Sequence, residues 1–314
     1  MQKRGNCLVL GGCGFIGSHL SEALLACGHF VRIFDKRNVN TANIAAFKDR
    51  VELVTGDFMN EDELRGVLKD IDVVVHLVSM TLPKSSNDNM IYDVETNLSG
   101  TLRLLNLARQ QGVSKVVYAS SGGTVYGVPQ FQPITESHPV DPLCSYGITK
   151  LATEKYLHLY RHLYGLDYTV LRIANPYGER QDPASGQGAV TTFVWRALSG
   201  EPIVIWGDGS VARDFLHISD LVDAFLRVIH GGTPSRVYNI GCGEPCTLNR
   251  LVEVIGRVTG TKPSVEYKPV RKLDVPVNYL DVTLAREELG WTPRLDLDQG
   301  IARLARYVRA ELNR

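Results

Sequence analysis

The first half of the chain alternates short apolar runs, rich in β-branched residues, with stretches of helical periodicity. Strands that are apolar throughout and separated by helices indicate a parallel sheet covered on both faces. We therefore expect an α/β fold, a doubly wound parallel sheet whose ligands lie beyond the carboxyl ends of the strands. The expected strands are 7–10, 31–35, 51–54, 73–77, 115–120 and 168–173, and the expected helices are 15–27, 61–69, 93–111 and 145–164.

The alternation is lost after about residue 175, which predicts a smaller C-terminal α+β region for substrate binding. Residues 175–188 are rich in Gly, Pro, Asp and Gln and predict a long loop. We expect one domain from 1–174, to which 214–236 returns, and a second from 175–213 and 237–314. The second half is expected to contain a strand at 203–206 and helices at 190–198, 219–229, 248–258, 284–289 and 297–312.

Composition excludes several classes of protein. The 34 Lys and Arg residues balance 34 Asp and Glu residues, so no basic excess points to nucleic acid. No apolar run approaches the roughly 18 residues of a membrane span, so no membrane partner is expected. The six cysteines form no CxxC pair and favour free thiols in the cytoplasm. His158 and His162 form an HxxxH pattern with no glutamate between them, and no metal site is expected.

A glycine-rich turn follows the first expected strand and opens the first expected helix. Residues 11–17 read GGCGFIG and satisfy the spacing GxGxxG. In such a turn one glycine permits the tight bend, another lets backbone N–H groups approach a pyrophosphate, and a third lets the helix pack closely. The pattern predicts that residues 1–174 form a Rossmann-type dinucleotide-binding domain.

The second expected strand ends at Asp35, eighteen residues after Gly17. A carboxylate at this place accepts hydrogen bonds from the adenosine ribose and repels a 2′-phosphate, which favours NAD over NADP. Lys36 and Arg37 follow directly, and they would receive a 2′-phosphate if Asp35 turned away. Asp57, after the third strand, would place a carboxylate near the adenine amino group or belong to an ordinary turn.

Tyr146 and Lys150 form a YxxxK pattern on an expected helix, where a spacing of four places both side chains on one face. A nearby ammonium stabilises a phenolate, so we expect Lys150 to lower the pKa of Tyr146. A Ser/Thr-rich strand end that contains Ser120, Ser121 and Thr124 precedes this helix. The combination is typical of a site for hydride and proton transfer.

Together these motifs resemble the extended short-chain dehydrogenase/reductases, and most closely the nucleotide-sugar epimerases of the UDP-galactose 4-epimerase type. Segments 97–101, 171–178, 213–220, 271–274 and 289–293 also match that family. The resemblance implies NAD-dependent epimerisation of a nucleoside-diphosphate sugar at C4 through a transient 4-keto sugar. The sugar stays open between UDP-glucose and UDP-galactose, their N-acetyl forms, and a dTDP-linked 6-deoxy sugar. Asn278, at the family's substrate gate, is small enough to admit an N-acetyl group.

The resemblance also implies residue roles. Tyr146 would be the acid/base, Lys150 would tune it and hold the nicotinamide ribose, and Trp206 would face the base. The implied cofactor-binding residues are Gly11, Gly14, Phe15, Ile16, Gly17, Asp35, Asp57, Phe58, Leu77, Asn97, Ser120, Tyr146, Lys150 and Ala174. The implied substrate-binding residues are Asn175, Val204, Trp206, Arg213, Arg271 and Asp274, with the two arginines on the phosphates. Helices near 98–111 and 145–164 would form the four-helix interface of a homodimer.

The chain departs from the family pattern at Gly122, which occupies the position of the usual catalytic hydroxyl. Thr124 and Ser121 are the candidates to supply it, and Thr124 is favoured. Family dehydratases carry an Asp-Glu pair where this chain has Gly123 and Thr124, which disfavours a 4,6-dehydratase. A 4-ketoreductase that consumes NADPH is opposed by Asp35, and an inactive NAD-sensing scaffold is opposed by the intact YxxxK pattern.

Overall fold

A computed structural model describes residues 5–270 and 275–313, which divide into two compact units. The first unit comprises Met1–Gly127, Pro139–Arg172 and Val222–Tyr238. The second unit comprises Val128–His138, Ile173–Leu221 and Asn239–Arg314.

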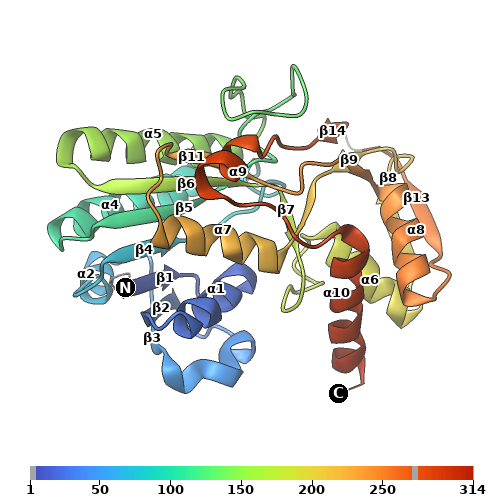
Figure 1. Cartoon of the computed structure of the whole chain (residues 1–314), viewed down its shortest axis with the longest axis horizontal. Coiled ribbons are helices and arrows are strands. Elements are labelled where there is room, and N and C mark those ends of the chain that lie inside the picture. Colours follow the sequence, from blue (N-terminus) through green and yellow to red (C-terminus); the bar gives the residue numbers. More distant parts are fainter. Residues whose placement is uncertain (1–4, 271–274, 314) are drawn as a thin grey trace. The chain divides into compact units, whose positions relative to one another are not determined.

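A seven-stranded sheet forms the centre of the first unit, in the order β11-β6-β5-β4-β1-β2-β3 (Figure 1). The pairs β1–β2, β2–β3, β1–β4 and β4–β5 are parallel, as the apolar runs predicted. The strand order reverses between β1 and β4, which is the place where doubly wound sheets bind ligands. The strands are β1 (Asn6–Leu10), β2 (Phe30–Lys36), β3 (Glu52–Gly56), β4 (Val73–His76), β5 (Lys115–Ser121), β6 (Asp167–Ile173) and β11 (Val237–Ile240).

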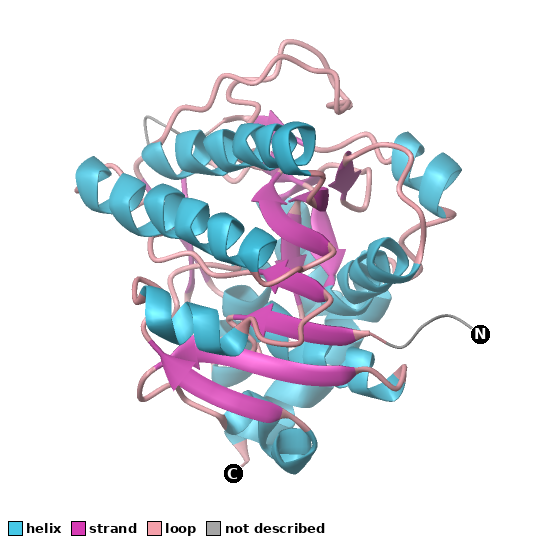
Figure 2. Cartoon of the chain, turned by 90° about the vertical axis from the view of Figure 1, so that its left-hand side faces the viewer, coloured by secondary structure: helices cyan, strands magenta, loops and turns pink. Residues whose placement is uncertain are grey.

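Helices lie in front of and behind this sheet, and Figure 2 shows the strands between them. On one face, strand residues such as Leu8 and Val116 share a buried core with Leu64, Leu104 and Leu157 of the covering helices. On the other face, α1 contacts β1 and β2. The sheet therefore has the two covered faces that its apolar strands require. The helices of these layers are α1 (Phe15–Ala26), the 3₁₀ helix η1 (Ala42–Arg50), α2 (Glu61–Val67), α4 (Gly100–Gln110), α5 (Ser145–Tyr164) and α7 (Ile218–His230).

The helix expected at 93–111 is instead three consecutive segments. It begins early, as α3 (Met90–Asp93), because the Asn89 side chain accepts a hydrogen bond from Tyr92 N. A wider π-helical turn, η2 (Val94–Ser99), then leads into α4. Within η2, the Asn97 amide bonds to Asp93 and to backbone outside the helix, and such bulges are common near functional sites. Sequence periodicity does not report these local bonds.

The second unit packs three helices around their own apolar core. Val194 of α6 (Ala189–Ser199), Leu251 of α8 (Leu248–Thr259) and Leu304 of α10 (Leu297–Leu312) are fully buried in it. The loop expected at 175–188 contains a strand, because three of its residues pair with a distant segment. The remaining elements are α9 (Thr283–Leu289) and the pairs β7 (Asn175–Tyr177) with β10 (Phe215–His217), β8 (Ile203–Trp206) with β13 (Val265–Lys268), and β9 (Ala212–Arg213) with both β12 (Cys246–Thr247) and β14 (Val277–Asn278).

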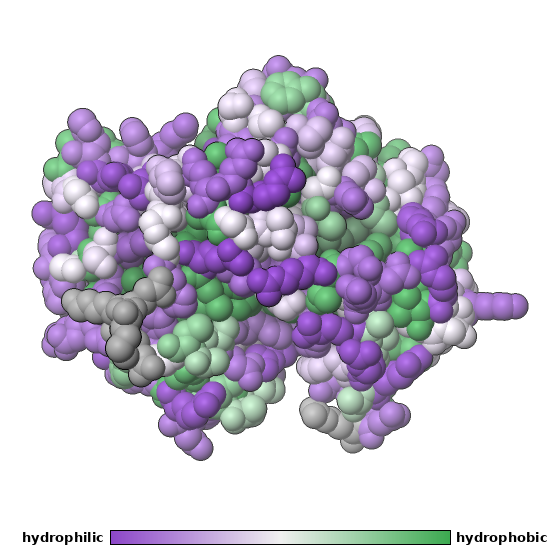
Figure 3. All heavy atoms as spheres, viewed as in Figure 1, coloured by the Kyte–Doolittle hydropathy of each residue, from purple (hydrophilic) through white to green (hydrophobic). Residues whose placement is uncertain are grey.

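Polar residues cover most of the surface in Figure 3, and apolar residues form separate patches between them. Scattered apolar residues of this kind are normal on a surface that faces water. Among residues 5–270 and 275–313, no helix combines the length and the apolar character needed to cross a bilayer.

Gly17 provides a test of the packing between α1 and the sheet. A Cβ atom at this position would overlap the Gly11 carbonyl oxygen and lie 2.6 Å from Gly12 Cα. Overpacking of this kind costs about 1–3 kcal/mol, so Gly17→Ala should lower the free energy of unfolding by that amount. Gly66→Ala is the matched control, because a Cβ atom there meets nothing within 4 Å. The control should stabilise α2 by about 0.5–1 kcal/mol. Equal thermal-denaturation midpoints for the two variants would refute the packing argument.

Candidate active site

The glycine-rich turn forms an open N-terminus for α1 beside the end of β1. Gly11 has φ of +82°, a conformation that favours glycine, and its N–H donates to the Phe34 carbonyl oxygen at 2.8 Å. The helix begins at Gly14 with no side-chain cap and no acidic residue in its first turn. Uncapped N–H groups and the helix dipole favour a bound anion. The turn thus has the chemistry of a pyrophosphate cradle.

Asp35 lies directly beside this turn. Its Oδ2 atom accepts a hydrogen bond from Cys13 N at 2.9 Å, and its Oδ1 atom accepts one from Lys36 N at 2.9 Å. Burial, together with the negative charge of Asp35, raises the pKa of the Cys13 thiol to about 12. The thiol therefore stays neutral, and Asp35 is held toward the glycine turn and does not turn away from it.

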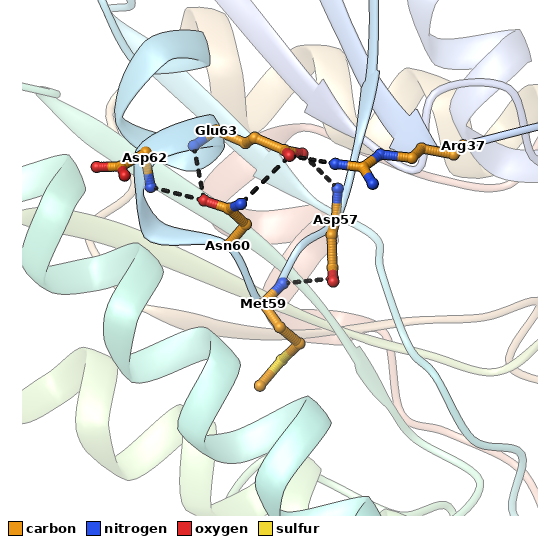
Figure 4. A network of polar contacts seen from close by, with 6 residues as sticks. All are labelled: Arg37, Asp57, Met59, Asn60, Asp62 and Glu63. Atoms are coloured by element: carbon orange, nitrogen blue, oxygen red, sulfur yellow. Dashed lines mark hydrogen bonds and ion pairs between the residues drawn. The ribbon is translucent and has the colours of Figure 1, made fainter.

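Arg37 and Asp57 meet in a polar network at the start of α2 (Figure 4). Glu63 pairs with the Arg37 guanidinium through Oε1 and accepts a hydrogen bond from Asp57 N through Oε2 at 2.7 Å. Asn60 caps α2 by accepting from Asp62 N and Glu63 N. Arg37 is therefore already paired, while the Asp57 carboxylate accepts from Met59 N at 2.9 Å.

Tyr146 and Lys150 share one face of α5, as the spacing predicted. The Lys150 Nζ atom lies 5.4 Å from the centroid of the Tyr146 ring and donates to the Ala119 carbonyl oxygen at 2.8 Å. Gly147, between them, lets the helix approach the Thr124 backbone, because a Cβ atom there would lie 2.9 Å from the Thr124 carbonyl oxygen. This close approach places the Tyr146 end of the helix against the turn that contains Thr124.

In the chain without ligands, burial shifts the pKa values of Tyr146 and Lys150 in the directions that favour their neutral forms. Desolvation, followed by the charges of Cys144 and Asp93, raises the pKa of Tyr146 above its ordinary value. Desolvation lowers the pKa of Lys150 to about 8, although Glu154 and Asp93 oppose the shift. The expectation of a lowered Tyr146 pKa is therefore wrong for the chain by itself, because burial disfavours the phenolate. Positive charge brought to the site by a ligand would favour ionisation of Tyr146.

Of the three hydroxyl residues at the end of β5, Thr124 and Ser121 are both half-buried, but among the described residues only Thr124 has a buried hydroxyl oxygen without a hydrogen-bond partner. Ser120 Oγ donates to Glu154 at 2.5 Å, and Glu154 forms a buried ion pair with Arg172 at 2.7 Å, so Ser120 is occupied. Ser121 is half-buried. The Thr124 Oγ1 atom is buried with no hydrogen-bond partner among the residues that the structure describes. Leaving a buried hydroxyl unpaired costs about 1–3 kcal/mol, which a ligand hydroxyl would recover.

Asp93 organises the first turn of α5, and no sequence motif indicated it. Its buried carboxylate accepts hydrogen bonds from Ser145 Oγ at 2.7 Å, Thr149 Oγ1 at 3.2 Å and Asn97 Nδ2 at 2.9 Å, and from Thr81. These donors come from segments far apart in the sequence, so their convergence is visible only in the folded chain. The network holds the residues on both sides of Tyr146.

Several side chains implied as cofactor ligands are engaged within the protein. The Asn97 amide accepts from Met80 N at 2.8 Å and donates to Asp93 at 2.9 Å. The Phe58 ring is buried, with its centroid 5.4 Å from that of His76. Leu77 N donates to the Leu10 carbonyl oxygen at 3.2 Å, just beyond the end of β4. Phe15 and Ile16 begin α1 and are half-buried.

The implied substrate residues that the structure describes all lie in the second unit, as does Ala174. Val204 and Trp206 alternate on β8 with the buried Ile203 and Ile205, so they point to the opposite face of the strand. Arg213 donates to the carbonyl oxygens of Ala212 and Val275, and Asn175 Nδ2 donates to that of Asp214. Arg271 and Asp274 lie outside the described residues.

Comparison with known proteins decides the family. The sequence profile described as "NAD dependent epimerase/dehydratase family" matches residues 7–241. The chain belongs to this family. It is 39% identical to a UDP-glucose 4-epimerase of Mycolicibacterium smegmatis, over 96% of this chain and 98% of that protein.

Two solved structures of 4-epimerases have the same fold over nearly their whole length. A UDP-glucose 4-epimerase from Thermotoga maritima, crystallised with UDP-glucose, has a TM-score of 0.93 and 36% identity and covers 98% of this chain and 99% of its own. A UDP-glucose 4-epimerase from Thermus thermophilus, in complex with NAD, has a TM-score of 0.89 and 32% identity. The match covers 97% of this chain and 99% of that structure.

NAD is the cofactor of this epimerase/dehydratase family, and the residues of the first unit fit it. The open N-terminus of α1 suits the pyrophosphate, and Asp35 at the end of β2 suits an unphosphorylated adenosine ribose. A nicotinamide ring carries a positive charge when oxidised, and a further positive charge near Tyr146 would favour its phenolate form. The paired guanidinium of Arg37 leaves one fewer cation for a 2′-phosphate.

Replacement of single hydroxyl groups tests which residue contacts the sugar. Thr124→Ala removes the unpartnered Oγ1 atom and should reduce nucleotide-sugar turnover about 10²-fold, as loss of one positioned hydrogen-bonding group does. Thr124→Ser keeps the hydroxyl and should retain a rate within about tenfold of the wild type. Ser121→Ala is the matched control and should change the steady-state rate only slightly. A larger loss from Ser121→Ala than from Thr124→Ala would assign the hydroxyl to Ser121 instead.

Proposed function

We propose that this protein catalyses the reversible, NAD-dependent epimerisation of a nucleoside-diphosphate sugar at C4, through a transient 4-keto sugar. The observation that carries the proposal is the buried, unpartnered Thr124 hydroxyl on the turn against which Gly147 packs the Tyr146 end of α5. A hydroxyl, a phenol and an ammonium held in one unit suit proton removal from a sugar hydroxyl.

Three residues of the first unit then have defined roles in the reaction. Tyr146 Oη accepts the proton of the sugar C4 hydroxyl and later returns it, while Thr124 Oγ1 orients that hydroxyl. Lys150 keeps its positive charge close to the Tyr146 ring and holds the nicotinamide ribose. NAD, held by the glycine-rich turn and Asp35, would supply reversible hydride acceptance at the same carbon.

The nucleotide sugar is proposed to bind through the second unit. Trp206 would stack on the base beside Val204, because both side chains point away from the core of that unit. Arg213 and Arg271 would bind the phosphates, while Asn175 and Asp274 would contact the rest of the ligand. The relative that is crystallised with UDP-glucose supports a UDP-hexose, and the N-acetyl forms and a dTDP-linked 6-deoxy sugar are the other candidates. Asn278, small and polar, is compatible with the N-acetyl form.

Alternative reactions of the same fold fit less well. A 4,6-dehydratase needs a further acid/base pair, and residues 122–124 carry no carboxyl group. A ketoreductase that uses NADPH is disfavoured by the fixed Asp35 and the paired Arg37. An inactive scaffold would have no use for the buried Tyr146 and Lys150 pair.

We also propose that the protein is a homodimer and acts in the cytoplasm. Ile148, Leu159 and Leu163 of α5 are 54%, 41% and 54% exposed, and their spacing places them on one stripe of the helix. Exposed apolar stripes of this kind are typical of protein interfaces. Pairing of α4 and α5 with the same helices of a second copy would cover the stripe. All six cysteines are free, which suits a reducing compartment.

A panel of UDP-, dTDP- and GDP-sugars tests the reaction. The expected product is the C4 epimer, formed with catalytic amounts of NAD and without loss of water. Tyr146→Phe should slow this conversion about 10²–10⁴-fold, since it removes the general acid/base. Tyr156→Phe is the control, because this tyrosine lies on the same helix and is 37% exposed. Near-normal turnover by Tyr146→Phe, dehydrated product or stoichiometric consumption of NADPH would each contradict the proposal.

Charge placed on the apolar stripe tests the dimer. The double variant Leu159→Arg and Leu163→Arg should be monomeric in analytical ultracentrifugation, while its circular dichroism spectrum stays that of the wild type. Leu312→Arg is the matched control, since this leucine is 40% exposed in α10 of the second unit. A wild-type protein that sediments as a monomer at micromolar concentration would exclude the proposed assembly.

A further inference from the structure

Opposite charges stand side by side where β2 ends. Asp35, Lys36 and Arg37 are consecutive, and the carboxylate favours a ribose hydroxyl whereas the two cations favour a 2′-phosphate. The sequence alone favours NAD through Asp35, but it also supplies two cations that would bind a 2′-phosphate if Asp35 turned away. Which cofactor is accepted depends on which of these charges is available to the adenosine end of the ligand.

Asp35 is available at the glycine turn and is held there. Two backbone N–H groups, those of Cys13 and Lys36, each donate to one of its carboxylate oxygens at 2.9 Å. Because both donors belong to the main chain, the carboxylate keeps this position whatever the neighbouring side chains do.

Arg37, in contrast, is engaged by a carboxylate from another element. Its guanidinium pairs with Glu63 Oε1 in the first turn of α2, although the Arg37 side chain itself is 65% exposed. Figure 4 shows the Arg37 guanidinium pointing toward the Glu63 carboxylate. Glu63 is the fixed partner, because its Oε2 atom accepts from Asp57 N at 2.7 Å and its own N–H donates to Asn60 Oδ1 at 3.2 Å.

We propose that Glu63 is a cofactor-specificity residue, which favours NAD by pairing with Arg37 and withholding that guanidinium from a 2′-phosphate. Arginine binds phosphate strongly through its planar, two-pronged guanidinium. Loss of the Glu63 charge would remove both the partner of Arg37 and a negative charge near the phosphate, so Arg37 would then turn to a 2′-phosphate.

The inference goes beyond the proposed reaction, because it concerns binding of the dinucleotide and applies whichever sugar is converted. The experiment therefore measures nucleotide binding without any sugar. The purified protein is equilibrated with equimolar NAD⁺ and NADP⁺, free nucleotide is removed, and bound nucleotide is released and quantified by chromatography.

Glu63→Gln keeps the size of the side chain and an oxygen that can accept from Asp57 N, but it removes the charge. The ratio of bound NADP⁺ to NAD⁺ should rise about tenfold, which corresponds to one new charge-assisted hydrogen bond net of the lost pair. Adding Arg37→Ala to Glu63→Gln should abolish the gain. Glu61→Gln is the matched control, because Glu61 lies in the same helix turn but pairs with Arg103, at 3.8 Å.

Arg37→Ala alone tests the idea in a second way that leaves the α2 cap intact. If Glu63 already withholds Arg37, this variant should change the nucleotide ratio less than about twofold. A several-fold loss of bound NADP⁺ would show that Arg37 is already available and would overturn the proposal. An unchanged ratio in folded Glu63→Gln would overturn it, as would an equal gain in Glu61→Gln or a gain that survives Arg37→Ala.

Discussion

Close approach of backbone to backbone at two glycines underlies the site. Gly17 lets α1 pack against the Gly11 carbonyl group, and Gly147 lets α5 pack against the Thr124 carbonyl group. In both places a methyl group would have to displace main chain, which cannot move as a side-chain end can. The two contacts bring the open end of one helix and the Tyr146 end of another to the carboxyl ends of the strands.

Burial then determines the electrostatics of the site. The carboxylates of Asp93 and Glu154 lie inside the first unit and are satisfied by several donors each, so they act as fixed supports. Desolvation raises the pKa of Tyr146 and lowers that of Lys150, so it favours the neutral form of each side chain. The buried Thr124 hydroxyl also lacks a hydrogen-bond partner among the described residues, which a bound ligand would supply. Such a site favours proton transfer only once cofactor and sugar have entered.

The residues at the end of β2 show how a fold selects among charges that the sequence places together. Asp35 is held by main-chain donors, whereas Arg37 is drawn to Glu63 on a different helix. The nucleotide preference therefore depends on a residue twenty-six positions away in the chain. The pair forms where Asp57 N, directly after β3, holds the Glu63 carboxylate at the start of α2.

The sequence by itself determined the parallel sheet, the glycine turn, the Tyr146 and Lys150 pair and the family. Periodicity and short spacings involve residues that are close together along the chain, so they can be read directly from the sequence. Only the tertiary structure decided that η2 widens at Asn97, that residues 175–177 form a strand, and that Asp93 anchors α5. It also decided that burial raises the pKa of Tyr146 and that Glu63 pairs with Arg37. Desolvation and long-range pairing depend on which segments meet, and that information exists only once the chain has folded.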